Sequence, residues 1–112
     1  MKKIEVVVRV EKLDEIRMGL EKAGFIGTTV TEVKGRGAQK GVMLEWRAGG
    51  YRVEFLPKVK IDLVVKDADV DKAVDAIVKS ARTGEIGDGK IFVTNVERVV
   101  RIRTGETGEN AV

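Results

Sequence analysis

The sequence predicts an α+β fold in which one antiparallel sheet is covered by two helices. Four segments are dense in β-branched apolar residues, which is typical of strands. Two others have apolar residues at three- and four-residue spacing, which is typical of amphipathic helices. The segments follow one another in the order β-α-β-β-α-β. A length of 112 residues fits one domain, so we expect residues 1–112 to form a single unit.

The first half of the chain predicts a strand, a helix and a second strand. Residues 3–9 read as a largely buried strand. The apolar face of the following helix consists of Leu13, Ile16, Leu20 and Ala23. Gly24 is expected to end this helix, because glycine is the commonest residue just past a helix C-terminus. A second strand, rich in Thr and Val, is expected over residues 25–34.

The second half predicts a strand, a helix and a last strand. Residues 59–65 alternate in hydropathy, and Asp67 or Asp69 can cap the next helix. The apolar face of that helix consists of Val70, Val74, Ile77, Val78 and Ala81. A strand begins at residues 90–93, residues 96–102 are expected to extend the sheet, and the tail 104–112 is expected to be flexible. This order is the split βαβ of the ferredoxin-like fold, with a long connection between its second and third strands.

The composition favours binding over catalysis. The chain has no cysteine and no histidine, which excludes disulfides, thiol nucleophiles, imidazole acid–base chemistry and the usual zinc sites. We therefore expect no enzyme, and any metal to be a hard cation such as Mg²⁺ with a phosphate ligand. A net charge of +3 is too small to indicate nucleic acid. No apolar run is long enough for a membrane span and no signal peptide is recognisable, so a cytoplasmic protein without membrane insertion is expected.

Eight of the 13 glycines lie in two connections, residues 35–57 and 82–90. The second resembles a phosphate cradle, since glycines let backbone N–H groups face an anion and Lys90 adds a charge. A tight structural turn is the alternative. Arg101 and Arg103, two residues apart, could grip one phosphate or be simple solvated charges. The aromatic and arginine residues of 35–57 suit a protein partner, or a loop folded back on its own body.

Several segments together closely resemble the PII nitrogen-regulatory signal transduction proteins. They are Thr29-Val30-Thr31-Glu32-Val33-Lys34-Gly35, Gln39-Lys40-Gly41, Phe55-Leu56-Pro57-Lys58-Val59-Lys60, the stretch from Thr83-Gly84 to Phe92-Val93, and Arg98-Val99-Val100-Arg101-Ile102-Arg103-Thr104-Gly105. Gly87-Asp88-Gly89-Lys90 and Arg101-Ile102-Arg103-Thr104-Gly105 are specific together. The resemblance covers nearly the whole chain. It implies a homotrimer of ferredoxin-like subunits with nucleotide sites in the clefts between neighbours, where ATP and ADP compete and Mg-ATP permits 2-oxoglutarate to bind.

The resemblance also implies which residues bind these ligands. The nucleotide contacts fall on Thr29, Gly37, Ala38, Val64, Gly87, Asp88, Gly89, Lys90, Arg101 and Arg103. The 2-oxoglutarate contacts fall on Gly37, Gln39, Lys40, Gly41, Lys58 and Gly87, with Gln39 as the side-chain ligand of Mg²⁺. Position 38 is commonly arginine in the family, so Ala38 removes one phosphate contact.

The long connection corresponds to the loop with which the family contacts its targets. In the branch that controls ammonium transporters, an arginine near the loop tip blocks conduction, and Arg47 occupies that place beside Trp46. An ammonium transporter is therefore the preferred target, which could recruit the protein to the membrane, and glutamine synthetase or another enzyme is the alternative. Tyr51 aligns with the tyrosine that some bacterial members have uridylylated, but its neighbours depart from the common pattern.

Two functions of other classes are alternatives to regulation. A slow ATP-hydrolysing enzyme would place Lys90 and Asp62 near the phosphates, but the sequence offers no histidine to activate water. An RNA-binding ferredoxin-like domain would need spaced aromatic residues on the sheet to stack bases. Phe92 is the only aromatic residue of the last strand, so the sequence favours a regulator without nucleic acid.

Overall fold

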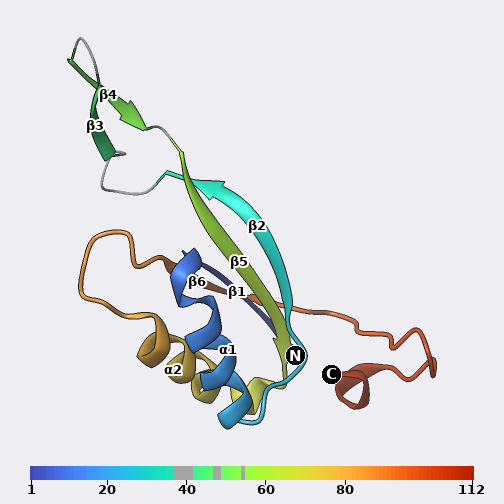
Figure 1. Cartoon of the computed structure of the whole chain (residues 1–112). Helices are drawn as coiled ribbons and strands as arrows, with labels where there is room; N and C mark the ends of the chain where they lie inside the picture. The colour runs from blue at the N-terminus through green and yellow to red at the C-terminus, as the bar shows by residue number, and fades with distance from the viewer. Residues whose placement is uncertain (37–41, 47–48, 54) are drawn as a thin grey trace.

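The structure, a computed structural model, describes residues 1–36, 42–46, 49–53 and 55–112. Its main sheet is antiparallel, in the strand order β2-β5-β1-β6. The strands are β1 (Lys2–Arg9), β2 (Thr29–Gly35), β5 (Leu56–Val65) and β6 (Lys90–Asn95). Helices α1 (Leu13–Lys22) and α2 (Val70–Ala81) lie side by side on one face of this sheet (Figure 1). The predicted ferredoxin-like α+β fold is confirmed.

The hydrophobic core lies between the sheet and the helices, and strand alternation places it there. Successive side chains of a strand point to opposite faces, so every second residue of β1 and β5 meets the helices. These residues are Ile4, Val6, Val8, Val59, Ile61, Leu63 and Val65, each at most 4% exposed. Helix spacing brings Ile16, Leu20, Ala73, Ile77 and Ala81 to meet them. The predicted apolar faces thus agree with the core in most positions, but Ala73 was not predicted, and the predicted Ala23 and Val78 are outside the core cluster.

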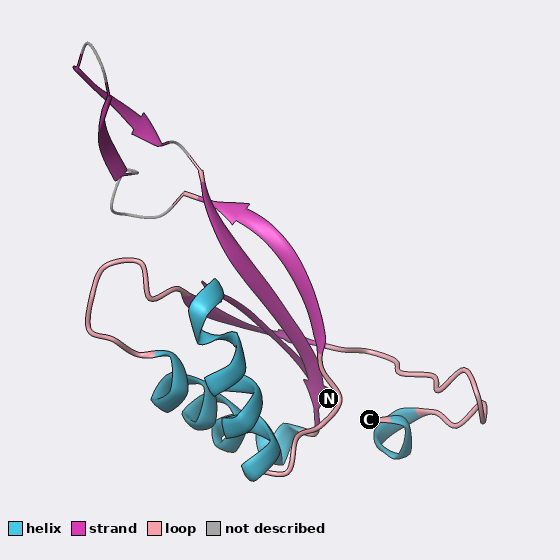
Figure 2. Cartoon of the chain, in the orientation of Figure 1, coloured by secondary structure: helices cyan, strands magenta, loops and turns pink. Residues whose placement is uncertain are grey.

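The opposite face of the sheet carries charges in a compact arrangement. Lys3 Nζ lies 3.8 Å from an oxygen of Asp62, and Lys60 Nζ lies 3.9 Å from an oxygen of Glu5. No helix of the described chain covers this face, as the view by secondary structure shows (Figure 2). It is therefore the face that a second chain could cover.

The second strand begins later than its composition predicts. Phe25 N–H donates to the Leu20 carbonyl at 2.8 Å and Gly24 N–H to the Glu21 carbonyl at 3.0 Å. This pair of bonds is the Schellman ending of a helix, and Gly24 takes the positive φ (+97°) that the motif requires. Phe25 packs against the core as part of this helix ending, so β2 begins only at Thr29.

Of two other local predictions, one holds in part and one is wrong. Asp69 occupies the N-cap position of α2, but its side chain makes no capping hydrogen bond, because a 3₁₀ turn, Asp67–Asp69, leads into the helix. The Asp67 carboxylate accepts instead from the Met1 amine at 2.7 Å. Residues 96–102 do not extend the sheet, which ends at Asn95. Beyond it, Val100 pairs only with Thr107, where the C-terminal segment turns back on itself.

The long connection between β2 and β5 contains a hairpin of its own. Strands β3 (Val42–Trp46) and β4 (Gly49–Val53) pair antiparallel, with Leu44 opposite Tyr51. In Figure 1 the hairpin projects beyond the ends of β2 and β5, and the molecule measures 60 × 25 × 20 Å. None of the helices in the described part of the chain combines the length and apolar character that a membrane crossing requires.

Candidate functional site

The loop between α2 and β6, residues 83–89, meets the ends of β1 and β5. Gly89 lies against β1 so closely that a Cβ placed on it would be 2.0 Å from the Val7 carbonyl oxygen. Its φ of +105° is also one that other residues rarely adopt. Gly89 is therefore required where the loop enters β6, and the loop has a fixed position on the sheet.

The Asp88 carboxylate organises the first half of this loop. It accepts hydrogen bonds from Thr83 N–H at 2.8 Å, from Gly84 N–H at 2.9 Å and from the Thr83 hydroxyl. The Thr83 hydroxyl oxygen in turn accepts from Glu85 N–H at 3.1 Å. These bonds, the Thr83 hydroxyl first among them, lower the pKa of Asp88 from 3.8 to about 2. Asp88 is therefore an anion that serves the loop itself.

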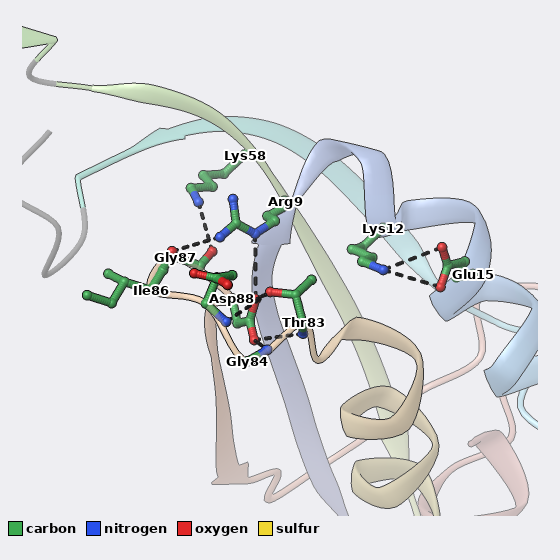
Figure 3. A network of polar contacts seen from close by, with 10 residues as sticks. Arg9, Lys12, Glu15, Lys58, Thr83, Gly84, Ile86, Gly87 and Asp88 are labelled. Carbon is green, nitrogen blue, oxygen red and sulfur yellow. Dashed lines mark hydrogen bonds and ion pairs between the residues drawn. The ribbon is translucent and has the colours of Figure 1, made fainter. Parts of the chain in front are cut away.

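Two cations from neighbouring strands hold the second half of the loop (Figure 3). Arg9, at the end of β1, donates from Nη2 to the Ile86 carbonyl at 2.7 Å, and its Nε lies 3.6 Å from the Asp88 carboxylate. Lys58, in β5, donates from Nζ to the Gly87 carbonyl at 3.2 Å. Lys58 is only 8% exposed, so its ammonium group depends on this contact for a partner. The two carbonyls are consecutive along the loop.

The N–H groups of Ile86, Gly87 and Asp88 have no hydrogen-bond partner within the described ranges, whereas those of Thr83, Gly84 and Glu85 do. Consecutive free N–H groups form an anion-binding concavity. Lys90, the exposed first residue of β6, follows directly. The loop thus offers three backbone donors and a lysine, a set that suits phosphate oxygens.

Beneath the loop lies a hollow of about 260 Å³. Its lining is largely apolar and includes Val6, Ile77 and Ala81 from the core. The lining also includes the cations Arg82 and Lys90, whereas its apolar part offers phosphate oxygens no partners. A phosphate would therefore lie toward Lys90 and the free N–H groups.

Other predicted nucleotide residues lie at the far end of the same sheet. Thr29 pairs with Asp62, and Val64 pairs with Lys3, whereas Lys58 pairs with Arg9 near the loop. Six strand positions separate Lys58 from Val64, roughly 20 Å at about 3.3 Å per residue. A hollow of about 240 Å³ lies at this end, and its lining includes Val64 and Gly27. Within one chain, the loop and this hollow are separate.

Arg101 and Arg103 lie apart from the loop as well. They follow the Asn95 end of β6, whereas Lys90 is at its other end, about 17 Å away. The Arg101 guanidinium is engaged locally, by the Glu106 carboxylate at 3.0 Å and the Asn110 carbonyl at 3.1 Å. Arg103 is exposed in the adjoining turn. One chain alone does not bring these arginines to the phosphate loop.

The remaining predicted residues belong to the long connection. Gly37, Ala38, Gln39, Lys40, Gly41 and Arg47 lie outside the described residues. Trp46 and Tyr51 lie in the paired strands of the hairpin. Across the part of the chain that is described, no three acidic, cysteine or histidine residues cluster as metal ligands. Residues 83–90 fit phosphate, whereas a Mg²⁺ ion would need oxygen ligands from elsewhere, phosphate oxygens among them.

Sequence reasoning missed Arg9 as part of this site, and it placed Thr83 in the loop without assigning it the bonds to Asp88. A threonine-glycine pair four to five residues before an aspartate is a local signal for the Thr83–Asp88 bonds. No local signal could identify Arg9, because 77 positions separate it from Ile86.

Comparisons with known proteins give one consistent result. A family model described as "Nitrogen regulatory protein P-II" matches residues 1–106. The chain is 57% identical over 112 residues to "Nitrogen regulatory protein P-II 2" of Methanothermobacter thermautotrophicus, covering all of this chain and 97% of that protein. It is 58% identical to "Nitrogen regulatory protein P-II" of Mesorhizobium japonicum and 55% identical to that of Microchaete diplosiphon, covering both chains in full each time.

Proposed function

The chain belongs to the nitrogen regulatory protein P-II family, and from this premise we propose that it senses ATP, ADP and 2-oxoglutarate and regulates a target through residues 35–57. The observation that carries the nucleotide proposal is the run of free N–H groups at Ile86, Gly87 and Asp88 beside Lys90. The family consists of signalling regulators. A regulator needs no chemical step. A ligand that binds two arrangements of the loop with different affinities is enough to shift the population between them.

The proposed nucleotide site lies between chains of a homotrimer. The loop 82–90 of one chain binds the phosphates through Gly87, Asp88, Gly89 and Lys90, while Thr29, Gly37, Ala38 and Val64 complete the cleft. Arg101 and Arg103 come from a neighbouring chain. Their separation from the loop within one chain supports this arrangement, because two guanidinium groups beside a triphosphate need such a partner.

The proposed 2-oxoglutarate site lies beside the phosphates. Lys58 pairs with a carboxylate of the ligand, and Gly37, Gln39, Lys40, Gly41 and Gly87 complete the pocket. The 3.2 Å contact between Lys58 and the Gly87 carbonyl supports this, because it places the lysine against the phosphate loop. When bound, Mg²⁺ would supply positive charge between the triphosphate and the dicarboxylate, with Gln39 as its side-chain ligand.

The preferred target is a membrane ammonium transporter, which Arg47 and Trp46 at the tip of the connection would contact. A nitrogen-metabolism enzyme such as glutamine synthetase is the alternative, and Tyr51 is the residue that modification would reach. We place the protein in the cytoplasm, with recruitment to the membrane by the transporter. The projecting position of the β3–β4 hairpin supports a contact role (Figure 1).

Titration calorimetry tests the nucleotide proposal. ATP and ADP are titrated into the wild-type protein with and without Mg²⁺ and 2-oxoglutarate. We expect Lys90→Ala to weaken ATP binding by about ten-fold or more, because a charge-assisted contact to phosphate is lost. Lys79→Ala, which removes an exposed lysine of α2, is the matched control. Equal ATP affinity for Lys90→Ala and wild type would remove Lys90 from the site.

A further inference from the structure

Arg9 reaches the phosphate loop from outside it and contacts two of its residues. Its Nη2 donates to the Ile86 carbonyl at 2.7 Å, and its Nε faces the Asp88 carboxylate at 3.6 Å. The side chain is 27% exposed, so most of it lies against the protein. Figure 3 shows the guanidinium between the end of β1 and the loop. Arg9 therefore links the first strand to the loop.

The direction of the Ile86 carbonyl fixes the direction of the next N–H group. In a trans peptide unit the C=O and the N–H point in opposite directions, and the described chain has no cis peptide bond. Because the Ile86 carbonyl points to Arg9, the Gly87 N–H points away from it. Lys58 acts likewise on the Gly87 carbonyl, so the Asp88 N–H points away from Lys58. Two cations thus fix the directions of two consecutive N–H groups.

Arginine suits this position better than lysine. A guanidinium presents several donors in a planar fork, so it can hold a carbonyl and face a carboxylate at once. The Nε of Arg9 is one of two buried side-chain polar atoms in the described chain without a hydrogen-bond partner. At 3.6 Å from Asp88 it makes an ion-pair contact that is too long for a hydrogen bond.

We propose that Arg9 is a positioning residue for phosphate binding, which holds the Ile86 carbonyl and the Asp88 carboxylate so that the Gly87 and Asp88 N–H groups face the ligand. The inference rests on the proposed nucleotide binding and adds to it a residue that does not itself touch the phosphates. It predicts that Arg9 acts through loop order.

The test compares wild type with Arg9→Gln and Arg9→Lys in the full-length assembled protein. Arg17→Gln is the matched control, because Arg17 is an exposed arginine of α1 that, among the described residues, pairs only with Glu21, at 3.0 Å. ATP affinity is measured by calorimetry. Hydrogen exchange is measured for residues 82–90, where the bonded N–H groups of Thr83, Gly84 and Glu85 report loop order.

We expect Arg9→Gln to weaken ATP binding by about ten-fold. Its exchange should be faster in residues 82–90 but unchanged in α1 and β5. Arg9→Lys keeps the charge but loses the fork, so its ATP affinity should lie between wild type and Arg9→Gln. Arg17→Gln should match wild type in both measurements.

Two results overturn the inference while wild type binds ATP. One is an ATP affinity of Arg9→Gln equal to that of wild type. If Arg9→Gln does not fold, an equal ATP affinity of Arg9→Lys has the same meaning. The other is faster exchange throughout the chain, which would make Arg9 a general fold contact. Failure of the wild type to bind ATP would instead overturn the proposed function, and this inference with it.

Discussion

Asp88 shows at the scale of one residue how structure refines a sequence motif. Within Gly87-Asp88-Gly89-Lys90 the sequence places it among the nucleotide contacts. In the structure its carboxylate accepts hydrogen bonds from Thr83 and Gly84 at the other end of the loop. Its side chain therefore shapes the loop, and the backbone N–H group is what it can offer a ligand.

The pH dependence of the loop follows from the low pKa of Asp88. The hydrogen bonds, that of the Thr83 hydroxyl first, lower this pKa from 3.8 to about 2. The stabilisation is therefore fully present above about pH 4 and is lost as the pH falls toward 2. We expect the amide NMR signals of Thr83 and Gly84 to stay constant from pH 5 to 3.

Asp88→Asn is the control for this titration, because it removes the titrating group. Its loop should show no change attributable to position 88 at any pH. A wild-type transition of the Thr83 and Gly84 signals centred near pH 3.8 would contradict the assigned hydrogen bonds.

At the scale of elements, the packing of α1 on α2 depends on a glycine within a helix. Glycine at such a position costs about 1 kcal/mol relative to alanine. A Cβ on Gly19 would lie 2.3 Å from the Ser80 hydroxyl oxygen, which donates to the Ala76 carbonyl at 2.8 Å. Gly19 therefore allows the two helices to approach closely.

This packing predicts a non-additive pair of substitutions. In a Ser80→Ala background, Gly19→Ala should raise the free energy of unfolding by about 0.5–1 kcal/mol, because helix propensity improves and the hydroxyl is absent. In the wild-type background the gain should shrink or reverse, because Ser80 must leave its bond. Urea unfolding at one fixed protein concentration measures both effects. Equal changes in both backgrounds would show that the hydroxyl is no obstacle.

At the scale of the whole molecule, one chain holds separate parts of the proposed site. The phosphate loop lies at one end of the sheet, Val64 lies at the other, and Arg101 leaves from the far end of β6. The charged sheet face and exposed apolar residues are left for other chains to cover. Ile102 is 99% exposed and Ile26 is 80% exposed. These features fit a subunit of an assembly better than an isolated monomer.

We expect sedimentation analysis to give a mass near 37 kDa, about three times the 12.3 kDa chain. Arg101→Ala with Arg103→Ala should keep this mass but weaken ATP binding. This variant is then mixed with an excess of Lys90→Ala chains and the subunits are allowed to exchange. Some mixed trimers should then contain sites in which Lys90 comes from one chain and Arg101 and Arg103 come from another. No recovery of ATP affinity in the mixed trimers would place the arginines and the loop in the same chain.

Local sequence patterns predicted most of the fold, but only a part of the site, the phosphate loop. The strands and helices, their apolar faces and the phosphate loop are encoded by neighbouring residues, as Val6 in its strand and Ile77 in its helix illustrate. The predictions for residues 25–28 and 96–102 were wrong because strand-forming composition does not supply a partner strand. Phe25 completes a helix ending instead, and beyond β6 only the Val96 N–H still bonds to the first strand's end, at the Met1 carbonyl, among the described residues.

By itself the sequence determined the order of elements, the core faces, the glycine-rich loops and the family. Only the tertiary structure decided that Arg9 and Lys58 hold consecutive carbonyls of the loop, and that Arg101 is engaged by Glu106 far from Lys90. The physical reason is the range of the interactions. Periodicity and glycine content act over a few residues, whereas the register of β1 with β5 and β6 brings together groups that are distant along the chain.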